Sequence, residues 1–167
     1  MRLPSPEPGG ASSAAPDPVN HPVNVSVASR LPVPPEEAWR LLTYWEQQSR
    51  WMRDAASVRV LTERREGAGV QLAVRTRILS IPLFTERLEI VAWEPPRRLV
   101  MAHRSFIHGV GVWRVDPVPG GSLFRWVEEI SLPVPVLGWI ALAAYRPFMQ
   151  RLMRGAMRNL RRLSAGE

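Results

Sequence analysis

Residues 23–61 read VNVSVASRLPVPPEEAWRLLTYWEQQSRWMRDAASVRVL, and they carry the clearest strand and helix signals of the chain. In its first part Val23, Val25 and Val27 alternate with small polar residues. Alternation with a period of two is typical of a strand that buries one face. We therefore expect a strand over 23–31.

A helix start follows this strand. Pro34 and Pro35 preset the backbone φ of a first helical turn and lack N–H groups that such a turn leaves unpaired. Glu36 and Glu37 favour the positive end of a helix. Apolar side chains then recur at helical spacing and form one stripe that faces a core. The stripe consists of Ala38, Leu41, Leu42 and Trp45. A short second helical turn is expected within 43–52.

Length and composition indicate one domain with a leader. The chain has 167 residues and is 46% hydrophobic, which is enough apolar surface for a single core. Residues 1–22 are rich in Pro, Gly, Ala and Ser, so we expect a disordered leader there and one domain over 23–164. The leader lacks the apolar run of a secretory signal. The apolar segment 134–145 is far shorter than the roughly 20 residues that span a bilayer, so we expect a soluble, cytoplasmic protein.

Charge and cysteine content exclude several classes of protein. The formal net charge is +7, and all 22 basic residues are arginine. This one-sided usage suggests coding bias, and no helix-turn-helix, zinc-finger or RNP-like pattern accompanies it, so we do not expect nucleic-acid binding. The chain has no cysteine, and its three histidines lack the spacing of metal ligands. We predict no metal and no cofactor, because P-loop and dinucleotide fingerprints are absent as well.

The middle of the chain predicts a run of antiparallel strands. Short alternating segments are separated by Gly- and Pro-containing turns, with Ile81-Pro82 ending one strand and Pro119-Gly120-Gly121 forming a hairpin turn. The expected strands are 57–63, 70–79, 84–93, 98–106, 108–115 and 122–132. With the first strand, the pattern gives six or seven sequential strands.

A long helical region closes the chain. Its apolar side chains share one side, and arginines occupy the opposite side. Because proline disrupts a helix interior and disfavours helical φ/ψ in the residue before it, we expect a kink or restart, with the main helix beginning near Pro147. The sequence thus predicts an α+β architecture in which a sheet covers one long final helix.

Four segments carry a specific resemblance. They are VPPEEAWRLLTYWEQQSRWM (33–52), WEPPRRL (93–99), GVWRVDPVPGGSLFRWVEEI (111–130) and RPFMQRLMRGAMRNLRRL (146–163). Over about residues 23–163 the chain resembles the START-like (SRPBCC) superfamily, and in detail the polyketide cyclase/dehydrase and lipid-transport family of small bacterial proteins. The resemblance implies a helix-grip fold, a curved antiparallel sheet of six to seven strands wrapped on a long C-terminal helix, with two short helices after the first strand. It does not decide the function, because members of one fold carry different chemistry.

In the fold that this sequence resembles, the sheet and the final helix enclose an apolar cavity. Strand parity places His103 on one face with Leu99 and Met101, and Glu128 on one face with Trp126. A histidine beside a carboxylate can move protons at neutral pH, as a cyclisation or dehydration of a poly-β-ketone requires.

The alternative is a purely structural role, in which His103 is a hydrogen-bonded residue of the cavity wall and Glu128 pairs with Arg75 or Arg114. Arg114 points into the cavity if it shares an inward parity with Val110 and Val112. The opposite parity, with Gly109, Gly111, Trp113 and Val115 inward, is nearly as well supported. The candidate ligand-binding residues are Met101, His103, Val112, Arg114, Phe124, Trp126, Phe148 and Leu152.

We favour a binding module for a small hydrophobic molecule such as a lipid, a quinone or a polyketide-like compound. The alternative is a cofactor-independent polyketide cyclase/dehydratase with His103 and Glu128 as candidate catalytic residues. A structural role through protein contacts is a third reading. The six arginines between Arg146 and Arg162 leave open a transient contact with an anionic membrane surface, although such a face is usually just solvated. Monomer and homodimer are both left open.

Overall fold

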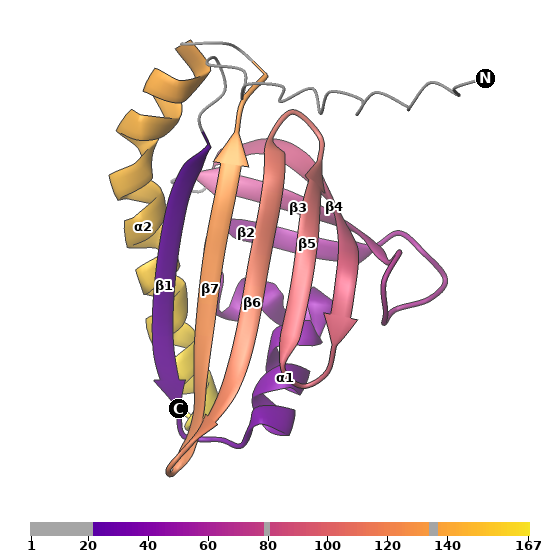
Figure 1. The fold of residues 1–167 in the computed structure, drawn as a ribbon, viewed down its shortest axis with the longest axis vertical. Coiled ribbons are helices and arrows are strands. Elements are labelled where there is room, and N and C mark those ends of the chain that lie inside the picture. The colour runs from indigo at the N-terminus through magenta and orange to yellow at the C-terminus, as the bar shows by residue number, and fades with distance from the viewer. Residues whose placement is uncertain (1–21, 79–80, 134–136) are drawn as a thin grey trace, which may run out of the picture.

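The computed structural model describes residues 22–78, 81–133 and 137–167, and the expected leader over 1–22 falls almost entirely outside them. Within the described part, seven strands form one antiparallel sheet in the order β1-β7-β6-β5-β4-β3-β2 (Figure 1). The strands are Val23–Leu31 (β1), Ala55–Val60 (β2), Gln71–Ile78 (β3), Ile81–Glu94 (β4), Arg98–Arg104 (β5), His108–Val118 (β6) and Gly121–Ser131 (β7). The helices are Pro35–Thr43 (α1), the 3-10 helix Trp45–Arg50 (η1) and Leu137–Ser164 (α2). This is the helix-grip architecture that the sequence predicted.

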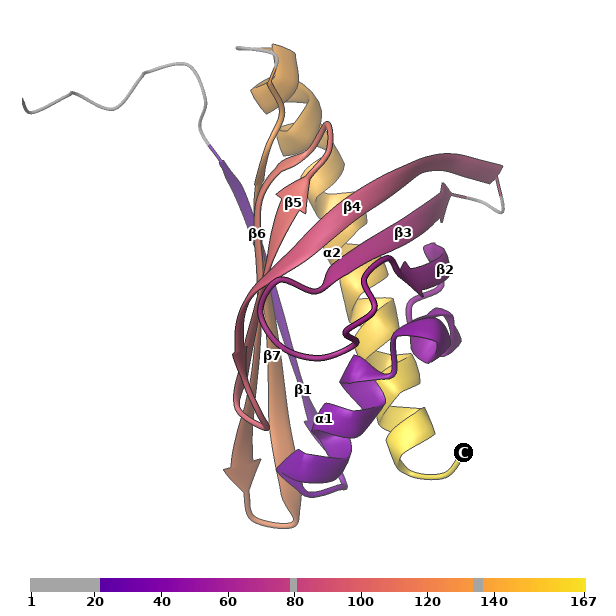
Figure 2. The ribbon, with the colours of Figure 1, turned by 90° about the vertical axis from the view of Figure 1, so that its right-hand side faces the viewer.

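The sheet is curved, and all the helices lie on its concave side. Figure 2 shows β1, β5, β6 and β7 in profile, with β3 and the first part of β4 bending over towards α2. The first strand pairs with the last, with Val23 opposite Ile130 and Leu31 opposite Ser122. The apolar core therefore fills the space between the sheet and the helices.

The start of α1 follows the predicted proline signal. Pro34 is the N-cap in an extended conformation, Pro35 begins the helix, and two glutamates occupy the first turn. Trp39 and Leu42 are buried. The ring of Trp39 packs edge-on against that of Trp93, with 5.1 Å between the centroids. Aromatic contact thus holds α1 against the end of β4, where the WEPP segment begins.

The start of the C-terminal helix differs from the expectation. α2 begins at Leu137, and Pro147 lies inside it. The prediction of a start near Pro147 was wrong because packing outweighed the local penalty of a proline. Leu142, before the proline, and Met153, after it, are both buried on the same side. One continuous apolar stripe against the sheet therefore spans Pro147.

Some strand boundaries also differ. β4 begins at Ile81, so Pro82 lies within the strand instead of ending its predecessor. The pairing of β3 with β4 shifts register between Thr76 and Arg77, and Arg77 stands opposite Pro82. A bulge is one of the few places where a sheet accepts a proline, which explains the difference.

Candidate functional site

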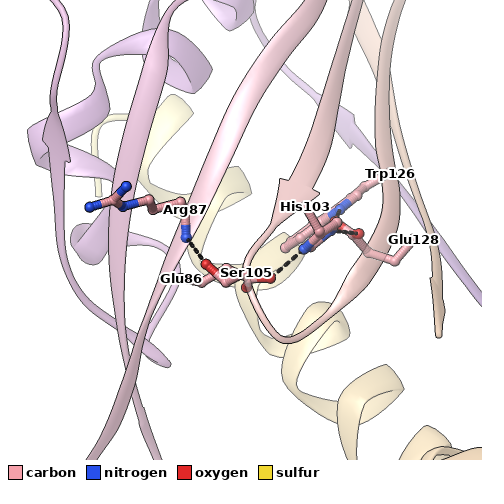
Figure 3. A network of polar contacts seen from close by, with 6 residues as sticks. All are labelled: Glu86, Arg87, His103, Ser105, Trp126 and Glu128. Carbon is pink, nitrogen blue, oxygen red and sulfur yellow. Dashed lines mark hydrogen bonds and ion pairs between the residues drawn. The ribbon is translucent and has the colours of Figure 1, made fainter. Parts of the chain in front are cut away.

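Three polar side chains from three strands meet on the concave face of the sheet. Nδ1 of His103, on β5, lies 2.6 Å from Oε1 of Glu86, on β4. Nε2 of the same His103 ring lies 3.0 Å from Oε2 of Glu128, on β7. The indole N–H of Trp126 donates to the other oxygen of Glu128. Figure 3 shows the imidazole between the two carboxylates. We call Glu86, His103, Glu128 and Trp126 the polar network.

Glycines on β6 allow the contact between His103 and Glu128. β6 lies between β5 and β7, with Gly109 opposite His103 and Gly111 opposite Glu128. A Cβ added at Gly111 would lie 2.7 Å from Oε1 of Glu128. The carboxylate therefore occupies the space that a side chain on β6 would fill, and His103 and Glu128 touch across the intervening strand. Gly109 has a φ of +135° and its own backbone requirement for glycine.

The network holds a proton strongly. The side chains of His103, Glu86 and Glu128 are only about a tenth exposed. Burial alone would lower the pKa of His103, but the hydrogen bonds and negative charges of Glu128 and Glu86 outweigh it and raise the pKa to about 10. This raised pKa favours the imidazolium form of His103 at neutral pH, in which each ring N–H donates a hydrogen bond to one carboxylate.

The polar network lies in the wall of a cavity of about 730 Å³ between the sheet and α2. This volume is in the range of small-molecule sites. Most of the lining is apolar, including Trp126, Ile130, Leu142, Met149, Leu152 and Met153. Phe84 and Phe106 also line it and are 45% and 62% exposed, so apolar rings lie where the cavity meets solvent.

A second polar group lines the same cavity. It consists of Asp54, just before β2, and Tyr145 of α2. Burial raises the pKa of Asp54, and burial together with the nearby Asp54 charge raises the pKa of Tyr145. The Ser105 hydroxyl, which accepts a hydrogen bond from the backbone N–H of Arg87 at 2.8 Å, lines the cavity too. The cavity thus combines an apolar interior with a few polar groups.

The structure brings only some of the predicted site residues to the cavity. His103, Glu128, Trp126 and Leu152 line the cavity. Met101 and Phe124 are buried in the core instead, and Phe148 is more than a third exposed. Neither of the arginines considered as partners of Glu128 pairs with it, because His103 and Trp126 occupy its oxygens.

Val112 and Arg114 are not among the described residues that line the cavity. Gly111, Trp113 and Val115 are buried, whereas Arg114 is exposed on the other face of the sheet. Of the two parities that the sequence left open, the structure has the one with the glycines and Trp113 inward. The inward positions of this segment of β6 are Gly111, Trp113 and Val115, and the glycine gives no hydrophobic signal.

Sequence reasoning missed Glu86, although a signal was present. In the expected strand 84–93, Phe84, Leu88 and Ile90 share one parity, and Glu86 has the same parity. A carboxylate at an inward position among apolar residues indicates a buried partner. Asp54 and Tyr145 offered no such signal, because a loop brings the first to the cavity and the second precedes a proline that was expected to interrupt the helix.

Comparison with known proteins agrees with this geometry. The family described as polyketide cyclase/dehydrase and lipid transport matches residues 22–165. An uncharacterized protein of Mycobacterium tuberculosis, Rv2574, is 27% identical over an alignment of 137 residues that covers 79% of this chain and 78% of the relative. No helix in the described part of the chain is both long and apolar enough to cross a membrane.

Two solved structures share the fold at low identity. A START superfamily protein from Mycobacterium smegmatis superposes with a TM-score of 0.66 and 12% identity, covering 84% of this chain and 98% of that one. The di-domain ARO/CYC StfQ of the steffimycin biosynthetic pathway superposes with a TM-score of 0.70 and 14% identity, covering 87% of this chain and 51% of that one. By the extent of the family match, the chain belongs to the polyketide cyclase/dehydrase and lipid transport family.

Proposed function

We propose that the protein binds a small hydrophobic molecule in the cavity between the sheet and α2. The observation that carries this proposal is the cavity itself, with about 730 Å³ enclosed by largely apolar side chains and a few convergent polar groups. Pockets of this size and composition bury most of the surface of a small ligand. A lipid, a quinone or a polyketide-like compound has suitable chemistry.

The proposal is tested by native mass spectrometry of protein purified gently from its own host, followed by identification of any retained molecule. The matched variants are Leu152→Trp, which puts an indole into the cavity, and Arg151→Trp, which puts the same group on the exposed side of α2. We expect a retained apolar molecule in the wild type and in Arg151→Trp, and its loss in Leu152→Trp. Equal retention by all three proteins would contradict binding in this cavity.

A cofactor-independent cyclase or dehydratase is the second candidate, and the polar network favours it. An aldol cyclisation needs a base that removes a proton from a carbon between two carbonyls, and an acid that protonates the alkoxide formed by the new carbon–carbon bond. Subsequent loss of that hydroxyl and a neighbouring proton releases water. With its pKa raised to about 10, His103 suits the acid, and Glu86 beside it suits the base.

Substitution of His103 separates the two functions. In an enzyme, His103→Ala should abolish turnover of a poly-β-ketone, because the proton donor is gone. In a carrier, the same variant should keep most of its ligand affinity, because the apolar lining is unchanged. Turnover that survives His103→Ala would exclude the proposed acid.

Contact with an anionic membrane surface stays a prediction. The arginines of α2 are exposed, and within the described residues none of them forms a salt bridge with an acid. Attraction to anionic lipid is worth roughly 1 kcal/mol per basic residue at the surface. Cosedimentation with phosphatidylglycerol vesicles that is lost in high salt would support docking, and absence of cosedimentation at low salt would refute it.

A further inference from the structure

The charge of the polar network follows from hydrogen-bond counting. Two carboxylates face the two nitrogens of one imidazole at 2.6 and 3.0 Å, and each contact needs one proton between its atoms. The two protons leave either an imidazolium with two carboxylates, or a neutral imidazole with one carboxylate and one carboxylic acid. Both arrangements carry a net charge of −1.

No positive charge in the cavity wall compensates this charge. Among the described residues that line the cavity, His103 is the only basic one, and no arginine takes part. Asp54 adds a second acidic group, although burial raises its pKa and favours its neutral form. The arginines that give the protein its positive charge lie elsewhere, including the exposed side of α2.

One carboxylate oxygen of the network, Oε2 of Glu86, can accept a hydrogen bond from a ligand. Glu128 uses one oxygen for Trp126 and the other for His103. Glu86 uses only Oε1, so in the described part of the chain its Oε2 has no hydrogen-bond partner. Because Glu86 lines the cavity, an O–H or N–H group of a ligand can donate to this oxygen. A carboxylate or phosphate has no proton to donate and would meet a like charge.

We propose that the cavity selects apolar ligands that carry a hydrogen-bond donor, such as a hydroxyl or an amine, and rejects ligands with an anionic headgroup. This inference rests on the proposed function, since it concerns the ligand of the same cavity. Two unit charges of like sign about 6 Å apart, at an effective dielectric constant of about 20, weaken binding about a hundredfold.

The test compares ligands that differ only in the headgroup. 1-Decanol, decylamine and decanoate compete at pH 8 with the neutral fluorescent probe N-phenyl-1-naphthylamine. We expect decanol and decylamine to displace the probe about a hundredfold more strongly than decanoate. Decanoate that binds as tightly as decanol would overturn the inference and leave the cavity proposal intact. Failure of the probe and of every decyl compound to bind would overturn both.

A charge-neutralising variant sharpens the comparison. The double variant Glu86→Gln/Glu128→Gln carries a charge of 0 or +1 in the network, however the imidazole is protonated. We expect its preference for decanol over decanoate to shrink at least tenfold. The matched control Glu89→Gln/Glu129→Gln removes two carboxylates from the same strands without touching the cavity lining. A control that loses the preference equally would show that general surface charge, and not the network, sets the selectivity.

Discussion

The proton held by His103 should make the stability of this protein depend on pH in the alkaline range. The pKa of His103 is about 10 in the folded protein, against 6.5 for an ordinary histidine. Since the folded value lies above the unfolded value, the stabilisation is fully present below about pH 6.5 and is lost as pH rises towards 10. Its full size is about 5 kcal/mol, at about 1.4 kcal/mol per pH unit.

Between pH 7 and pH 9.5 this contribution should fall by about 3 kcal/mol. The measurement is the free energy of unfolding in urea, followed by tryptophan fluorescence, for the wild type and for the variant Glu86→Gln/His103→Gln/Glu128→Gln. That variant removes every titratable group of the network, so the difference between the two proteins isolates its effect. The control His108→Gln removes a histidine outside the network and should retain the network's slope.

A difference in unfolding free energy between the two proteins that stays constant from pH 7 to pH 9.5 would show that the network does not hold the His103 proton in the folded state. An NMR titration of the His103 ring provides an independent check in the wild type alone. Ring signals that titrate near pH 6.5 would mean that the two carboxylates do not hold the proton.

Three further predictions concern the fold. Gly111→Ala places a methyl group against Glu128 and should destabilise the protein by about 1–3 kcal/mol in thermal unfolding. The control is Gly155→Ala, because a Cβ added there meets only the end of an arginine side chain at 4.0 Å. This control should stabilise the protein by up to about 1 kcal/mol. Equal effects of these two variants would show that the glycine on β6 does not serve the network. Pro147→Ala should raise the melting temperature, because a proline inside a helix costs about 3 kcal/mol; an unchanged melting temperature would favour a helix that restarts there. Leu160→Ala, at a fully buried position of α2, should cost about 2–5 kcal/mol in urea unfolding, and a loss below about 1 kcal/mol would argue that α2 is not docked on the sheet.

The sequence predicted best where one face of an element is apolar and the other polar. β7 has this pattern, and Phe124, Trp126, Glu128 and Ile130 share a buried face as expected. The start of α1 was predictable because prolines and glutamates act locally. Alternation along a strand and the residues at a helix start both depend only on residues close in the sequence, so both can be recognised in a single sequence.

The sequence-based predictions were wrong or incomplete where the conformation of a residue depends on residues far away in the sequence. The parity of β6 was ambiguous because Gly111 is inward without a side chain, and its reason for being glycine is Glu128 on another strand. Pro147 predicted a helix boundary, and only the packing of both halves of α2 explains its place inside. Pairing of His103 with two carboxylates required the order of strands, which places β4 and β7 on opposite sides of β5.

The pairing of the first strand with the last has a consequence for how the chain folds. β1 has its sheet partner in β7, about a hundred residues later, where Val23 stands opposite Ile130. The helix that packs beside β1 comes later still. Contacts between such distant segments form slowly, because a long loop must close before they contribute stability. During synthesis on the ribosome, β1 must therefore wait unpaired until β7 has emerged, and we expect the sheet to be completed only after that point.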